Sequence, residues 1–149
     1  MLALCCAAFL ATGLSVCAAT AQSGRKVTLR IFDPEGHVHA HVTLAGIVRS
    51  NTRVIKLPGD QPGAAHLSLA FTKAGWTSFC SLTRGLAHVG ARLHRLQSDA
   101  LKVDGRLYSH GYVEYRSFPN GLCVKGSAPR ILFSMKLTTA RSLTRLIRS

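Results

Sequence analysis

Apolar and polar residues alternate along several short stretches of the chain, and a period of two predicts β-strands. These stretches cover residues 27–32, 37–44, 53–57, 66–72, 76–82 and 131–138. Two further turns lie between apolar runs. Asp104-Gly105 is a strong two-residue hairpin signal, and Pro119-Asn120-Gly121 separates GYVEYRSF from LCVKG. The pattern therefore predicts a chain built mainly from short antiparallel strands.

The first two strands are expected to form a hairpin across Asp33-Pro34-Glu35-Gly36, which has the composition of a type I turn. Pairing Phe32 with His37 gives one wholly apolar face, and a slip by one residue would mix the two faces. This register places Arg30 directly opposite His39.

Two segments change to a helical period. In residues 83–97, Leu86, Val89, Leu93 and Leu96 fall on one side of a helix. Residues 139–149 have leucines on one side and arginines on the other, which predicts either a short basic amphipathic helix or a disordered tail. Strands, one helix and then strands again predict an antiparallel α+β fold.

The first 21 residues contain no charged side chain, are mostly apolar and end in Ala19-Thr20-Ala21. This small-x-small ending predicts a cleaved signal peptide, with a retained membrane anchor as the alternative. Cleavage leaves Cys80 and Cys123, and an even pair in an oxidising compartment predicts one disulfide. Two buried free thiols are the alternative.

The chain has 19 Lys and Arg against 6 Asp and Glu, a formal charge of +13. Such a balance favours anionic partners. Two basic stripes contain no acid and are expected to bind an anion or an acidic partner; they consist of Arg84, His88, Arg92 and Arg95, and of Arg141, Arg145 and Arg148. A plain solvated helix face is the simpler interpretation.

His37, His39 and His41 stand two apart, so that a strand would place them on one face, where histidines can share a metal ion. The expected position of Arg30 opposite His39 argues against a cation there. A metal site and a pH-sensitive surface therefore stay as alternatives to a solvated or partner-covered face.

No paired acids, G-x-S-x-G, P-loop or Rossmann fingerprint appears. Scattered serines and histidines leave a hidden triad open, but the sequence predicts a protein that is not an enzyme and needs no cofactor.

Several short stretches follow the order of a known family. They include Thr28-Leu29, Glu35-Gly36, Val54-Ile55 with Leu57, Gly59 and Gln61, Asp104-Gly105 with Tyr108, and Phe133 with Lys136-Leu137-Thr138. Through them the chain resembles the chemokine-like subunit of the cytomegalovirus pentameric entry complex, over most of the mature chain. It departs from that family in being shorter, in having fewer cysteines and in lacking glycosylation sequons.

The resemblance implies a chemokine-like sheet and helix in residues 22–98 after a signal peptide in residues 1–21. A second antiparallel β region in 99–138 and a basic tail in 139–149 would follow. It also implies a virion-envelope or secreted binding subunit of a viral glycoprotein complex used in host-cell entry and tropism. Its partners would be sister subunits and a host receptor, not nucleic acid, and no stable membrane span would follow cleavage. The alternatives are a free secreted module that binds glycosaminoglycan or an acidic protein, and an extracytoplasmic metal-binding protein built on the histidine strand.

Overall fold

The computed structural model describes residues 26–126 and 128–149. The expected signal peptide therefore lies outside the described residues. The elements are β1 (Leu29–Phe32), β2 (Val42–Thr43), β3 (Arg53–Ile55), β4 (Ala64–Ala70), α1 (Lys73–Leu93), β5 (Gln97–Val103), β6 (Arg106–Val113), β7 (Arg130–Lys136) and α2 (Leu137–Arg148), with two 3-10 turns at Leu44–Gly46 and Arg49–Asn51. The fold is α+β, as the pattern predicts.

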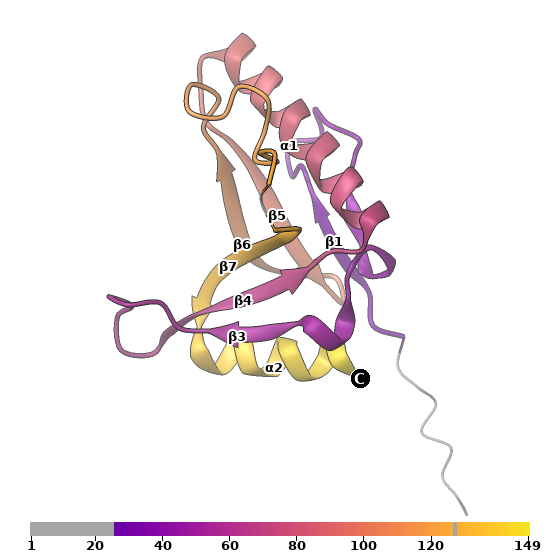
Figure 1. Cartoon of the computed structure of the whole chain (residues 1–149), viewed down its shortest axis with the longest axis vertical. Coiled ribbons are helices and arrows are strands. Elements are labelled where there is room, and N and C mark those ends of the chain that lie inside the picture. The colour runs from indigo at the N-terminus through magenta and orange to yellow at the C-terminus, as the bar shows by residue number, and fades with distance from the viewer. Residues whose placement is uncertain (1–25, 127) are drawn as a thin grey trace, which may run out of the picture.

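The strands form two antiparallel sheets. The first has the order β2-β1-β5-β6, and the second has the order β3-β4-β7. Figure 1 shows α1 along the first sheet and α2 beneath the second. β1 pairs with β5 and β4 pairs with β7, so each sheet combines strands from the sequence before and after residue 98.

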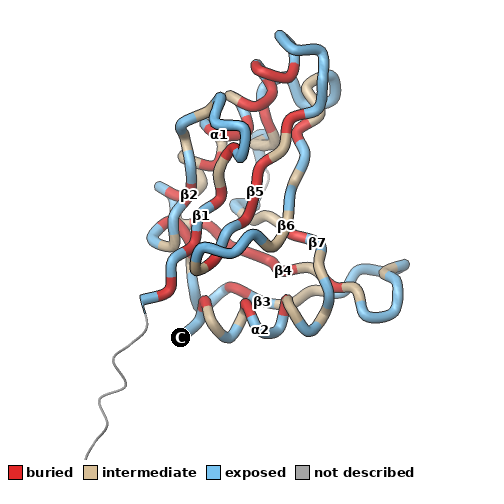
Figure 2. The backbone as a smooth tube through the Cα atoms, turned by 180° about the vertical axis from the view of Figure 1, so that it is seen from behind, coloured by how far each residue is buried: buried red, intermediate tan, exposed pale blue. Residues whose placement is uncertain are grey.

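One hydrophobic core joins both sheets and both helices. Its fully buried side chains include Ile31, Leu67, Leu82, Leu101 and Ile147. Strand alternation explains the arrangement in the first sheet: Ile31 and Leu101 point inward, while Arg30 and Lys102 beside them are exposed. Figure 2 views the molecule from the side opposite to Figure 1, with this sheet toward the viewer.

The predicted strand at 76–82 is wrong, because this segment is the first half of α1. Thr72 caps the helix, since its hydroxyl accepts a hydrogen bond from the Gly75 amide at 3.1 Å. The buried Phe79, Leu82 and Leu86 then follow at spacings of three and four. Phe79 and Leu82 of the predicted strand lie instead on the buried face of the helix.

The predicted hairpin register is also wrong. Ile31 pairs with Val42 and Arg30 with Thr43. The register therefore shifts by four residues, and because this number is even, each side chain stays on the expected face of the sheet. The Asp33 carboxylate accepts hydrogen bonds from the amides of Glu35 (2.8 Å) and Val38 (2.9 Å), which shapes a wider loop. Val38 packs against α1 at Gly85. A Cβ at this glycine would lie 2.7 Å from the Val38 side chain.

The hairpin at Asp104-Gly105 is confirmed, since β5 and β6 pair through it. The predicted strand LCVKG is wrong: residues 114–126 lie in a loop after β6. Glu114 starts this loop by accepting hydrogen bonds from the amides of Arg116 (3.1 Å) and Ser117 (2.7 Å). Of residues 139–149, left open between helix and tail, 139–148 belong to α2 and Ser149 follows it.

Candidate functional site

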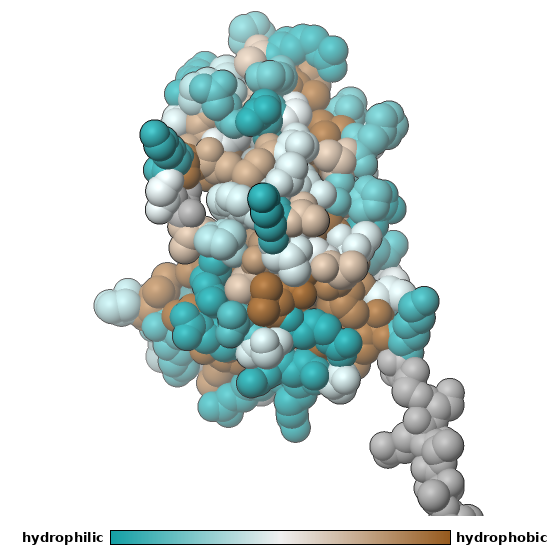
Figure 3. Space-filling model, turned by 45° about the vertical axis from the view of Figure 1, so that its right-hand side comes forward, coloured by the Kyte–Doolittle hydropathy of each residue, from teal (hydrophilic) through white to brown (hydrophobic). Residues whose placement is uncertain are grey.

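The outward side of α2 presents Arg141, Arg145 and Arg148. All three are exposed, whereas Ala140, Leu143 and Ile147 are buried. Spacings of four and three place the arginines on one side of the helix. We call these three residues the α2 arginine face. Figure 3 shows hydrophilic side chains gathered over the end of the molecule where α2 lies.

Both ends of α2 are fixed to the second sheet and its loops. At the start, the Leu137 amide donates to the Gly63 carbonyl at 2.8 Å. At the end, Arg49 donates its Nε–H to the Ile147 carbonyl at 2.7 Å, which satisfies a carbonyl that a helix end leaves without an intrahelical partner. The arginines are therefore held on a packed helix.

The second predicted stripe is only partly on one element. Arg84, His88 and Arg92 are exposed on α1, but Arg95 lies beyond its end, after His94, which has a left-handed φ of 53°. Leu93 and Leu96, expected to face inward, are 41% and 54% exposed. The structure places Arg84, His88 and Arg92 together on α1 and Arg95 apart from them.

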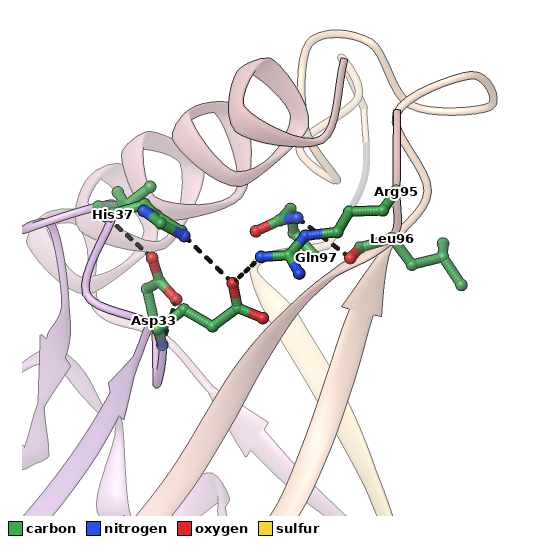
Figure 4. Close-up of polar contacts among 7 residues, drawn as sticks. Asp33, His37, Arg95, Leu96 and Gln97 are labelled. Atoms are coloured by element: carbon green, nitrogen blue, oxygen red, sulfur yellow. Dashed lines mark hydrogen bonds and ion pairs between the residues drawn. The ribbon is translucent and has the colours of Figure 1, made fainter. Parts of the chain in front are cut away.

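Arg95 is neutralised by the loop between β1 and β2. Its Nη2 donates to Oε2 of Glu35, and the same oxygen lies 3.1 Å from Nε2 of His37 (Figure 4). Within residues 26–126 and 128–149, Arg95 is the one Lys or Arg whose side chain lies within 4 Å of a carboxylate. It is therefore the least available of the predicted anion-binding residues.

The loop after β6 crosses α1 beside this stripe. Cys80 of α1 and Cys123 of the loop form the predicted disulfide, with Cα atoms 5.4 Å apart. One turn further, the Leu122 amide donates to the Thr83 hydroxyl at 3.2 Å. A Cβ on Gly121 would lie 2.6 Å from the Arg84 amide nitrogen. The disulfide thus fixes the loop against the helix.

The three spaced histidines do not lie on a strand. His37, His39 and His41 are exposed in the loop before β2, and Thr43, not His39, stands opposite Arg30. His41 Nδ1 lies 3.1 Å from the His39 carbonyl oxygen. In the part of the chain that the structure describes, no group of three His, Cys, Asp or Glu side chains could hold a metal ion.

Apart from Glu35, which pairs with Arg95, the acidic residues bind amides or a histidine or are buried. The Asp60 carboxylate accepts a hydrogen bond from the Leu57 amide at 2.7 Å and lies 3.0 Å from His66. These two contacts lower the pKa of Asp60. The other acids follow the same pattern: Asp33 and Glu114 bind loop amides, Glu35 binds Arg95, Asp104 binds the Thr28 amide, and Asp99 is buried.

One row of hydrogen-bonded polar side chains was not predicted from the sequence. His66 on β4 has Nδ1 3.0 Å from the Ser134 hydroxyl on β7 and Nε2 3.0 Å from Asp60. A hydrolase triad uses the opposite ring nitrogens in its best-known form. His66 and Ser134 are directly paired residues of neighbouring strands, so cross-strand pairing accounts for their contact. A hollow of about 180 Å³ lies elsewhere, beside His41, Gly46 and Gly75.

Searches for related proteins found no matching family model, no curated protein and no solved structure. Among the described residues, no helix has the length and apolar character needed to cross a membrane.

Proposed function

We propose that this protein is a non-enzymatic binding subunit that acts outside the cytoplasm and docks onto an acidic surface of a partner glycoprotein. The partner is a component of a viral surface complex used for host-cell entry, as the sequence resemblance implies. The observation that carries the acidic-partner part of the proposal is the α2 arginine face.

The charges of this face are unfavourable for the stability of the folded protein. Like charges four residues apart, such as Arg141 and Arg145, destabilise a helix by about 0.2–0.5 kcal/mol. The helix dipole favours cations in the last turn, which accounts for Arg145 and Arg148. Arg141 lies outside the last turn and has no carboxylate within 4 Å among the described residues. An acidic partner would compensate this charge.

The Cys80–Cys123 disulfide supports a location outside the cytoplasm. Disulfides persist in oxidising environments and are rare where glutathione and thioredoxin keep thiols reduced. The bond joins α1 to a loop whose Phe118 and Val124 are 40% and 60% exposed. Such side chains are suited to contact with another protein.

The test compares two charge reversals of equal size. Arg141→Glu/Arg145→Glu alters α2, and Arg84→Glu/Arg92→Glu alters α1. Immobilised poly-glutamate serves as a defined acidic polypeptide. We expect the α2 variant to bind at least about tenfold more weakly than wild type, a change of about 1.4 kcal/mol, while the α1 variant stays much closer to wild type. Equal losses would show that net charge alone governs binding and would refute the proposed face.

A further inference from the structure

The outward side of the first sheet presents a second basic surface, which is unrelated to the two helical stripes. Strand pairing places its side chains in rows. Arg30 of β1 stands directly opposite Lys102 of β5, and Phe32 stands opposite Ala100, which in turn faces His110 of β6. Tyr112 and Ser98 form the next row. We call Arg30, Phe32, Lys102, His110 and Tyr112 the sheet platform.

The platform points away from the core. The residues that alternate with it, including Ile31 and Leu101, are fully buried on the other side of the sheet. Arg30, Lys102 and His110 are exposed, and Tyr112 is 65% exposed. In the view of Figure 2, β1 and β5 lie toward the viewer and α2 lies below them.

The placement of its cations is unfavourable for folding. Like charges directly opposite each other on paired strands are destabilising, by up to about 1 kcal/mol. Neither Arg30 nor Lys102 has a carboxylate within 4 Å among the described residues. The acid closest in sequence, Asp104, lies in the β5–β6 turn, where its oxygen accepts a hydrogen bond from the Thr28 amide at 2.8 Å. A bound anion between the two cations would remove the repulsion.

Aromatic rings lie among these cations. The Arg30 guanidinium lies 5.2 Å from the centre of the Phe32 ring, a cation–π distance that holds the guanidinium close to the sheet. Tyr112 offers an exposed ring with a hydroxyl, a side chain that combines an apolar body with a polar tip. Flat rings pack against the C–H faces of sugar rings, while Arg and Lys bind anionic groups.

We propose that the sheet platform binds a sulfated polysaccharide. Sulfate groups would bind Arg30 and Lys102, and sugar rings would pack on Phe32 and Tyr112. Nucleic acid offers similar charge and flat bases, but the disulfide favours an oxidising compartment, in which sulfated glycans are the abundant polyanions. The inference concerns a different surface from α2 and does not rest on the proposed partner protein.

The test measures binding of the full secreted chain to a size-defined heparin oligosaccharide. Arg30→Ala/Lys102→Ala should weaken binding by about tenfold or more, equivalent to about 1.4 kcal/mol. Arg84→Ala/Arg92→Ala removes the same charge from α1, on the other side of this sheet, and should have a much smaller effect. Tyr112→Ala, which changes no charge, should also weaken binding, and Tyr112→Phe should restore most of it.

Three outcomes would overturn the proposal. Equal losses from the two double variants would show that binding follows net charge. An unchanged affinity of Tyr112→Ala would remove the sugar-packing surface. Tighter binding of a single-stranded oligothymidine than of heparin, with the same variant pattern, would make the platform a nucleic-acid site. Thermal unfolding and an intact Cys80–Cys123 crosslink establish that each variant is folded.

Discussion

Asp99 is a buried carboxyl group, and its replacement should change how stability depends on pH. It lies on the inward side of β5 and is 1% exposed. Among the described residues, neither carboxylate oxygen has a hydrogen-bond partner. A Cβ on Gly111 of β6 would lie 2.2 Å from Oδ1, so the carboxylate occupies the space above that glycine.

Burial raises the pKa of Asp99 from 3.8 to about 6. The amides of Gly111 and of Asp99 itself, and the charge of His110, oppose this rise without reversing it, although neither amide forms a hydrogen bond of good geometry with the carboxylate. One pKa unit corresponds to 1.36 kcal/mol, so the shift represents about 3 kcal/mol.

The direction follows from proton binding. Because the native state holds the proton more tightly than the unfolded chain, stability is highest below pH 3.8 and falls as the pH rises through 6. About 2.5 kcal/mol of the loss falls between pH 4 and pH 7. Asp99→Asn removes the titration, so its stability relative to wild type should improve by that amount over this interval.

The assay is urea unfolding of wild type and Asp99→Asn at pH 4, 5, 6 and 7, with the disulfide intact. Comparing the two proteins at each pH cancels the titration of the other groups. Ser98→Ala, on the outward side of the same strand, is the control and should show no such trend. A constant difference between wild type and Asp99→Asn across the series would refute the assigned burial and pKa.

Three further predictions concern the disulfide, a close helix contact and the histidine loop. Cys80→Ala/Cys123→Ala should lower the free energy of unfolding by about 4 kcal/mol, because the bond closes a loop with a sequence separation of 43; non-reducing peptide mapping of the wild type should find the crosslinked pair, and two alkylatable thiols would contradict it. Gly75→Ala should destabilise by about 2 kcal/mol or more, because its Cβ would lie 1.9 Å from the Gly46 oxygen, whereas Ser81→Ala on the exposed side of α1 should change little in the same melt. EDTA should leave the melting temperature unchanged, and a fall of many degrees would indicate a metal site at His37, His39 and His41.

Local signals in the sequence predicted local structure well. Asp104-Gly105 located the β5–β6 hairpin, and the spacing of leucines and arginines gave the helix α2 as one of two alternatives. The strand predicted at 76–82 failed because a cap at Thr72 and the contacts of Phe79 with the core outweigh the strand propensity of aromatic and β-branched residues. The predicted register of the first hairpin was wrong because the Asp33 side chain binds two loop amides. The alternation of apolar and polar residues gives no sign of these hydrogen bonds.

Some candidate sites depend on neighbouring residues and were predictable, whereas others depend on the pairing of distant strands and were not. The arginines of α2 were predictable because helical spacing depends on neighbouring residues. The opposition of Arg30 and Lys102 was not, since β1 and β5 are separated by more than sixty residues and their register is a tertiary property. The Asp60–His66–Ser134 chain was missed for the same reason. The disulfide was predictable because only two cysteines follow the apolar N-terminal segment.

The most direct test of the proposed function is the salt dependence of poly-glutamate binding by wild type and by Arg141→Glu/Arg145→Glu/Arg148→Glu. Exposed charges are screened beyond about 8 Å at physiological ionic strength. Wild-type affinity should therefore fall steeply between 50 and 300 mM salt, values chosen to span the range in which the screening length shortens. The variant should bind weakly, with a much flatter dependence. Equal affinities and equal salt responses of the two proteins would contradict docking through α2.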